Sequence, residues 1–192
     1  MAAFRIKSGT LFSVKLKDDL YTIGYAAEDA VRQYFDIKST DGNWDIDKPI
    51  KLKTLFSVYA GKASNALINE KLNADDYIFD KNTSESLWIR PGTSTGPGFV
   101  FKGGDLVKIL PGKDYVDAPV VNKNLSLPQD KDLIEKYELV NMWGADDLKE
   151  RLIRYFEKGI NRDDLKFEVF PGLWNDREKL RPLTSRLPVP LR

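Results

Sequence analysis

Among its 192 residues the sequence contains no histidine and no cysteine. Without histidine the chain cannot form a Ser-His-Asp or Cys-His catalytic arrangement, a His-ligated zinc site or an imidazole acid or base. Without cysteine it cannot form disulfides, thiolate nucleophiles or cysteine-ligated zinc sites. Catalysis would therefore depend on carboxylates, lysine, tyrosine, or a metal held by oxygen ligands alone.

Long apolar runs and an excess of charge of one sign are also missing. No stretch approaches the ~20 apolar residues of a membrane-spanning helix, and the first residues lack the apolar core of a signal peptide. The 30 Lys and Arg residues balance 29 Asp and Glu residues to a net charge of +1. Net charge therefore gives no support for attraction to nucleic acid or to an anionic membrane. We expect a cytoplasmic protein with neither as a partner.

The first half of the chain has the alternation of apolar and polar residues that is typical of β-strands. This pattern predicts a hairpin, a third strand, a strand interrupted near Lys53-Thr54, and two strands around a glycine-rich loop. A short helix is expected within the segment that begins at Gly61. The ranges of the expected strands are 11–16, 20–25, 31–37, 50–59, 85–91 and 98–110.

The sequence of the second half of the chain predicts helices and loops. Leu148, Leu152, Tyr155 and Phe156 follow helical spacing, and Gly159 is a suitable stop for that helix. A shorter helix is expected over 130–137, and a long surface connection over 111–129. We predict an α+β fold with a curved, mainly antiparallel sheet or partial barrel in the first ~110 residues and this C-terminal helix packed on it. A single domain would span 1–170, followed by an extended, Pro-rich, basic tail over 171–192.

Two segments and a set of four aspartate pairs resemble functional sites, but each has a simpler structural explanation. The glycines of "RPGTSTGPGFVFKGG" lack the spacing of a phosphate-binding loop, so a flexible hairpin loop is favoured. In "RLIRYFEKGINR" basic residues surround aromatic ones, but Tyr155 and Phe156 belong to the apolar stripe of the helix. The other face of this helix, which carries Arg151, Arg154 and Lys158, is therefore predicted to be solvated and ion-paired. Four pairs of adjacent aspartates suit turns and helix starts better than catalysis, because neighbouring side chains point to different sides. These pairs are Asp18-Asp19, Asp75-Asp76, Asp146-Asp147 and Asp163-Asp164.

The opening "SGTLFSVKLKDDLYTIGYAA" resembles the N-terminal hairpin of the bacterial immunity protein 26 family. The matching residues are Gly9, Phe12, Val14, Leu16, Tyr21 and Gly24. The later "YELVNMWGADDLKERLIRYF" resembles the closing block of that family at Glu138, Trp143, Arg151 and Leu152. The resemblance implies a non-enzymatic antitoxin of polymorphic-toxin or contact-dependent inhibition systems. Such a protein binds its cognate toxin and blocks the active site or the access of the substrate.

The leading hypothesis is therefore an immunity protein that needs no cofactor and no metal. Exposed acidic loops would complement the basic active site of a nuclease toxin and speed association. The candidate toxin-binding residues are Asp41, Asn43, Trp44 and Asp45 in one turn, with Asp75, Asp76 and Asp80 in an acidic loop. Two alternatives stay open: a β-barrel module that binds nucleic acid or a ligand through the basic tail and the loop at 92–98, and an oxygen-ligand metal enzyme that uses the aspartate pairs.

Overall fold

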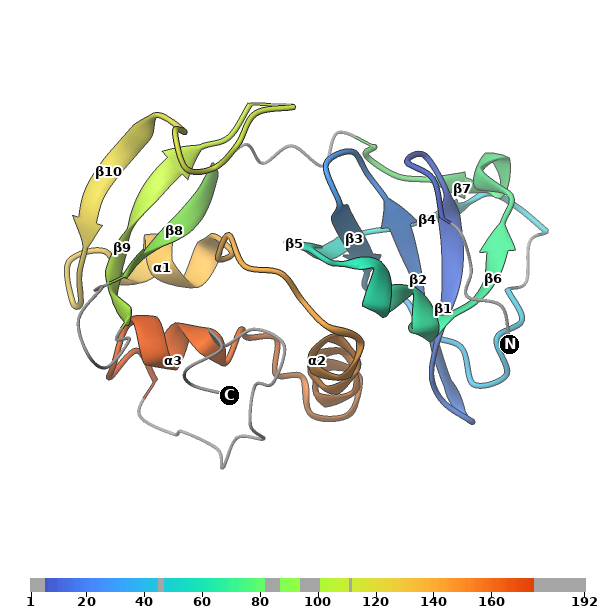
Figure 1. Cartoon of the computed structure of the whole chain (residues 1–192). Coiled ribbons are helices and arrows are strands. Elements are labelled where there is room, and N and C mark those ends of the chain that lie inside the picture. Colours follow the sequence, from blue (N-terminus) through green and yellow to red (C-terminus); the bar gives the residue numbers. More distant parts are fainter. Residues whose placement is uncertain (1–5, 45–46, 82–86, 94–100, 111, 175–192) are drawn as a thin grey trace. The chain divides into compact units, whose positions relative to one another are not determined.

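The computed structural model describes residues 6–44, 47–81, 87–93, 101–110 and 112–174 (Figure 1). The fold is α+β, as predicted, with mainly antiparallel sheets and a small number of helices. The chain divides into two compact units. Unit 1 contains residues 1–83 and 142–161, and unit 2 contains residues 84–141 and 162–192. Whether the two units act as the single domain expected over 1–170 stays a prediction.

Unit 1 is built on an open five-stranded antiparallel sheet with the strand order β5-β3-β2-β1-β6. The predicted hairpin and the predicted third strand are confirmed, and both β5 and β6 lie at edges of this sheet. The strands are β1 (Leu11–Lys17), β2 (Leu20–Ala26), β3 (Val31–Phe35), β5 (Thr54–Tyr59) and β6 (Ile68–Leu72).

A row of aromatic side chains crosses four strands of this sheet. Phe12 pairs with Gly24, Gly24 with Tyr34, and Tyr34 with Phe56. A Cβ atom at Gly24 would lie 2.5 Å from the ring of Phe12, so only glycine fits beneath that ring. The missing side chain on β2 therefore lets the neighbouring rings fill the centre of the row.

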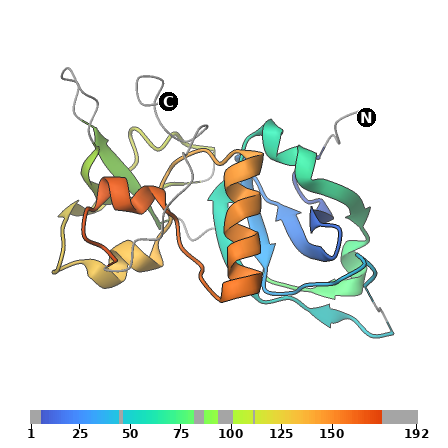
Figure 2. The ribbon, with the colours of Figure 1, turned by 90° about the horizontal axis from the view of Figure 1, so that it is seen from below.

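Helix α2 (Ala145–Lys158) covers the face of the sheet that carries this row (Figure 2). Leu148 and Leu152 are fully buried and join the same hydrophobic cluster as Phe12. The helix ends at Gly159, which adopts the left-handed conformation with φ 72°. The predicted helix, its apolar stripe and its glycine stop are thus confirmed, although Tyr155 and Phe156 on the stripe are only half-buried.

Two arginines on α2 are buried, so the predicted solvated face of this helix is wrong at both positions. The guanidinium of Arg151 lies over the ring of Phe56, 3.9 Å from its centroid, and also faces Trp143. Its Nε and Nη2 atoms donate to Oδ1 of Asn161 at 3.0 and 2.9 Å. Aromatic faces and an amide oxygen thus replace water around this cation. Arg154 is 8% exposed.

The opposite face of the sheet is covered by a two-stranded parallel ribbon, β4 (Ile50–Lys51) and β7 (Tyr77–Ile78). Phe79 follows β7 and packs edge-to-face against Tyr25 and Phe35, with ring centroids 5.1 and 5.2 Å apart. All seven residues of β2 are buried as a result of cover on both faces. The hairpin is therefore the centre of unit 1.

Two local predictions need correction. The strand expected over 50–59 is two strands, because β4 pairs with β7 whereas β5 pairs with β3. The helix expected after Gly61 is limited to 3-10 turns, η1 (Lys62–Leu67) and η2 (Ala74–Asp76). Between them the chain forms β6, because Ile68 pairs with Val14 and extends the sheet. Tertiary pairing overrides the local helical spacing here.

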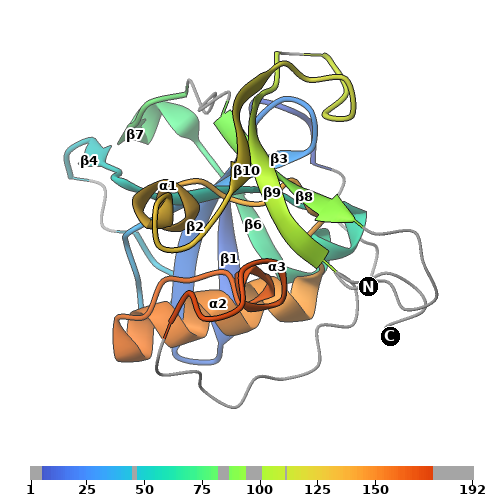
Figure 3. The same cartoon turned by 90° about the vertical axis from the view of Figure 1, so that its left-hand side faces the viewer.

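Unit 2 contains a three-stranded antiparallel sheet in the order β10-β9-β8 (Figure 3). The strands are β8 (Leu87–Thr93), β9 (Phe101–Lys108) and β10 (Val120–Leu125). Helices α1 (Lys131–Lys136) and α3 (Leu165–Val169) pack with β9 and β8 around a buried cluster that includes Ile89, Leu106 and Ile134. Strands β8 and β9 and helix α1 confirm the predicted elements. The expected surface connection over 111–129 needs correction, because it contains the strand β10. Helix α3 was not predicted.

The beginning of the expected tail belongs to the core of unit 2. Leu173 is 2% exposed, and Trp174 packs edge-to-face on Phe167 with ring centroids 4.8 Å apart. The guanidinium of Arg162 lies 5.0 Å from the ring centroid of Trp174. The rest of the expected tail, 175–192, lies outside the described residues.

Candidate functional site

The acidic turn after β3, which we define as residues 39–43, displays a fixed carboxylate on the surface of unit 1. Oδ1 of Asp41 accepts hydrogen bonds from Ser39 Oγ and from the backbone N–H of Asn43, both at 2.9 Å. Oδ2 accepts from Nδ2 of Asn43, also at 2.9 Å. These donors lower the pKa of Asp41, the backbone N–H of Asn43 most of all. The carboxylate is therefore ionised and held in one orientation.

The turn is attached to the central hairpin through Tyr21. The backbone N–H of Tyr21 donates to the carbonyl oxygen of Ser39 at 2.8 Å, and the N–H of Ser39 donates back at 3.1 Å. Gly42 has φ 80° and lies against the ring of Tyr21, where a Cβ atom would approach to 3.1 Å. A glycine at this position thus allows both the turn and the contact. These contacts anchor the turn that carries the exposed Asp41 to the β1–β2 hairpin.

The other predicted residues of this turn have different environments. Asn43 is exposed and is a partner of Asp41, as described above. Trp44 is half-buried, and among the described residues its indole nitrogen has no hydrogen-bond partner. Asp45 lies outside the described residues.

The predicted acidic loop flanks β7. Asp75 is exposed, and its backbone N–H donates to Oδ1 of Asn73 at 3.4 Å. Asp76 is half-buried, and Asp80 is exposed. Burial raises the pKa of Tyr77 to about 12, and the neighbouring carboxylates of Asp76 and Glu70 add to the effect. The structure places this loop on a different connection from the acidic turn.

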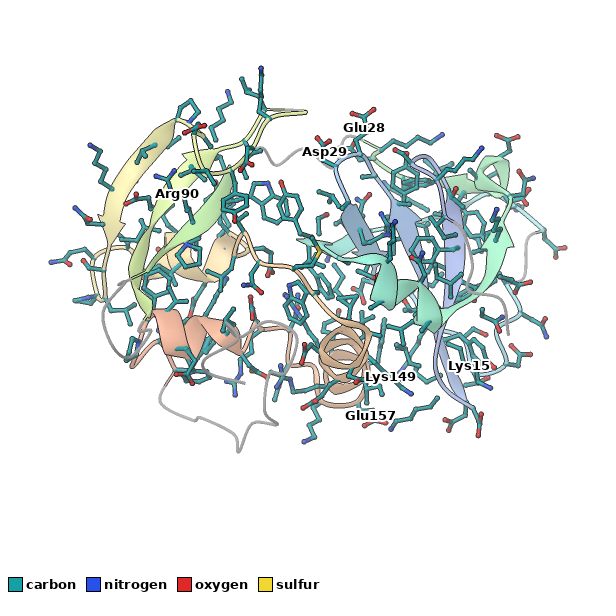
Figure 4. All side chains as sticks on the ribbon, viewed as in Figure 1. Lys15, Glu28, Asp29, Arg90, Lys149 and Glu157 are labelled. Carbon is teal, nitrogen blue, oxygen red and sulfur yellow. The ribbon has the colours of Figure 1, made fainter. Side chains whose placement is uncertain are left out.

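A third surface feature, on unit 2, was not predicted from the sequence. Arg90 on β8 is paired in register with Asp105 on β9, and its Nη2 atom lies 3.2 Å from Oδ2 of Asp105. Its Nη1 atom donates to the carbonyl oxygens of Tyr115 and Val116 at 3.4 and 2.6 Å. The side chain of Arg90 is labelled in Figure 4. We call this arrangement the Arg90 clamp. It fastens the β9–β10 loop to the sheet.

The pKa of the Asp105 carboxyl is lowered by its surroundings. The backbone N–H of Asn124 donates to its Oδ1 atom at 2.9 Å and is the main cause, with Arg90 as a further donor. The carboxylate of Asp105 is therefore ionised and neutralises the guanidinium of Arg90 within the clamp.

A family model described as "Domain of unknown function (DUF8309)" matches residues 1–175. The chain belongs to the DUF8309 family. The match covers the described parts of both units. Comparison with curated proteins and with solved structures finds no match.

The aspartate pairs of this DUF8309 protein have varied local roles. Asp18 forms an ion pair with Lys15 at 2.9 Å in the β1–β2 turn. Oδ1 of Asp163 accepts from the backbone N–H of Leu165 at the start of α3. Within the described ranges, no group of three or more acidic side chains is arranged to hold a metal ion.

The alternative binding site predicted for this DUF8309 protein used the glycine-rich loop and the basic tail. Most of the glycine-rich loop at 92–98 and the basic tail from 175 onward lie outside the described residues.

In the described part of the chain, no helix has both the length and the apolar character needed to cross a membrane.

Proposed function

We propose that this DUF8309 protein is a binding protein of the immunity type, which neutralises a cognate bacterial toxin in the cytoplasm by protein–protein contact. It would act by covering the active site of the toxin or by blocking access of the substrate. The observation that carries the proposal is the acidic turn, in which Asp41 is exposed yet held by three hydrogen bonds.

Binding is favoured by such a turn because its geometry is set before the partner arrives. The bonds from Ser39 and Asn43 fix the carboxylate of Asp41, so less side-chain entropy is lost on association. A fixed negative charge complements a basic surface and speeds encounter with it. The active site of a nuclease, which binds phosphates, is a surface of this kind.

The resemblance of the opening hairpin to immunity protein 26 gives separate support. Gly9 has φ 86°, and its N–H donates to the carbonyl oxygen of Ala26 at 2.7 Å, so glycine suits the position before the first strand. Phe12, Val14 and Leu16 are each 1% exposed and form the inner side of the sheet. The matching residues are therefore those that build the scaffold, which agrees with a family in which exposed loops select the partner.

The test uses the carboxyl-terminal domain of the protein encoded by the adjacent gene, which is the toxin domain if the proposal holds. Co-expression of the wild-type chain is expected to restore growth, and titration calorimetry should show a complex. Asp41→Asn keeps the shape but removes the charge, so we expect binding to weaken by about 10-fold, with a smaller dependence on salt. Asp19→Asn, at an exposed turn position, is the matched control and should change binding by less than about 2-fold.

Two results would contradict the proposal. One is failure of the wild-type chain to restore growth or to bind the toxin domain. The other is equal binding by wild type and Asp41→Asn at low and high salt, which would remove the acidic turn from the interface.

A further inference from the structure

The β9–β10 loop carries large apolar side chains into solvent. Tyr115 is 45% exposed, Val116 is 58% exposed, and Leu110 is 47% exposed. A single exposed apolar residue is ordinary on a protein surface, whereas several in one short loop indicate an interaction site. These side chains contribute little to the core of unit 2.

The loop is nevertheless held in one conformation. The Arg90 clamp binds its two central carbonyl oxygens, and the backbone N–H of Val116 donates to Oδ1 of Asp114 at 2.9 Å. The N–H of Ala118 donates to the carbonyl oxygen of Tyr115 at 3.3 Å, and Ala118 is buried. An apolar tip that is fixed in advance loses less entropy when it binds. Tyrosine is also among the residues that most often dominate binding energy.

Two carboxylates flank the apolar pair. Asp114 precedes Tyr115, and Asp117 follows Val116, and both aspartates are exposed. At the base of the loop Asp105 neutralises Arg90, and the exposed Lys113 offsets one of the two aspartates, so the loop keeps a net charge of −1. An anionic lipid surface would repel such a tip. A protein pocket with an apolar floor and a rim of Lys or Arg would complement it.

We infer that the segment Asp114–Asp117 is a binding tip that enters an apolar pocket with a cationic rim on the partner protein. This inference rests on the proposed function, since it assigns to the toxin domain the surface that receives the tip. Tyr115 and Val116 fill the pocket, and the two aspartates pair with the basic rim. Arg90 is a positioning residue that holds the tip from within.

The experiment compares variants of the full chain for binding to the same toxin domain. Tyr115→Ser combined with Val116→Ser should weaken binding by about 30-fold or more, as expected for residues at the centre of an interface. Val121→Ser removes an apolar side chain that is 57% exposed on β10, outside the loop, and should change binding by less than about 2-fold.

Two further variants separate the roles of charge and rigidity. Asp114→Asn with Asp117→Asn should slow association by about 10-fold at low salt and have little effect at high salt. Arg90→Gln leaves the side chains of the tip unchanged but releases its two carbonyl oxygens, so the tip is no longer fixed and binding should weaken by about 5-fold. Circular dichroism and thermal unfolding of each variant check that the fold is kept.

The possible outcomes distinguish the two proposals. If the wild-type chain does not bind the toxin domain, the proposed function fails and this inference fails with it. If wild type binds and the Tyr115/Val116 double variant binds equally well, only this inference is overturned. The inference is also overturned if the double variant instead loses binding to phosphatidylglycerol vesicles, or loses a wild-type dimer in analytical ultracentrifugation.

Discussion

The ammonium nitrogen of Lys166 lies 2.6 Å from the carbonyl oxygen of Ile134, and the lysine is only 2% exposed. The same nitrogen lies 3.2 Å from the carbonyl oxygen of Glu135. Both carbonyls belong to the last turns of α1, where helix carbonyls lack partners within the helix. A charged side chain from α3 therefore satisfies the end of α1 and fastens the two helices together.

Replacement of this lysine is the first prediction. Lys166→Met keeps the length of the side chain but removes this donor from the buried carbonyl oxygen of Ile134 and from that of Glu135. We expect a loss of about 2 kcal/mol in the free energy of unfolding, measured by urea denaturation. Lys131→Met, at an exposed position of α1, should change it by less than about 0.5 kcal/mol. Equal stability of the two variants would contradict the role given to Lys166.

The second prediction concerns the absent side chain at Gly24. Gly24→Ala would place a Cβ atom 2.5 Å from the ring of Phe12, so the ring or the strand must shift. We expect destabilisation of about 2 kcal/mol, measured in the same way. In a Phe12→Leu background, which lacks the outer ring atoms, the same change should have an effect smaller by about 1 kcal/mol. Strictly additive effects would show that the close approach does not limit this position.

The third prediction uses the turn between β2 and β3. Figure 4 shows Glu28 and Asp29 projecting outward there. Asp29 and Ala30 have φ 53° and 62°, values in the left-handed region that alanine rarely adopts. Ala30→Gly should therefore stabilise unit 1 by about 0.5 kcal/mol, detected as a higher melting temperature. Ala63→Gly, in the 3-10 turn η1, should destabilise it by a similar amount, and a melting temperature lowered by both changes would refute the strain at Ala30.

The fourth prediction is a pH dependence of the Arg90 clamp. The folded-state pKa of Asp105 is lowered, so its ionised form contributes stability that is fully present above the unfolded pKa of about 3.9 and is lost as pH falls through the folded pKa. Asp105→Asn should therefore lower the free energy of unfolding by about 1 kcal/mol at pH 7. The difference should shrink once the pH falls below about 4 and decrease further as the pH passes through the lowered folded-state pKa. A difference that stays constant from pH 7 to pH 2 would exclude this carboxylate as its source.

Local patterns predict the elements that depend on local interactions. The β1–β2 hairpin alternates clearly and turns over two aspartates, so neighbouring residues alone define it. The helix α2 combines an apolar stripe with Gly159 at its end, and both signals lie within one segment. The acidic turn also could be predicted, because Asp41 and Gly42 are turn residues that form bonds over two or three positions.

Features that depend on distant contacts were not predictable in this way. Arg151 looked solvated because its neighbours on α2 are charged, yet rings from two other segments surround it. The strand β10 has bulges at Asn122, so its sequence shows no clean alternation. The carbonyl oxygens of Tyr115 and Val116 accept from Arg90, which lies 25 and 26 residues earlier in the sequence. Only the fold brings the clamp and the loop together.

The path of the chain through unit 1 has a consequence for how the protein is made. Its sheet strands lie before residue 83, but α2 belongs to the segment 142–161. A growing polypeptide therefore completes the five strands while Phe12 and Val14 still lack their cover, until the ribosome releases the later segment. No single cut of the chain yields an intact unit 1, and a minimal version would need 142–161 grafted onto residue 83 through a linker.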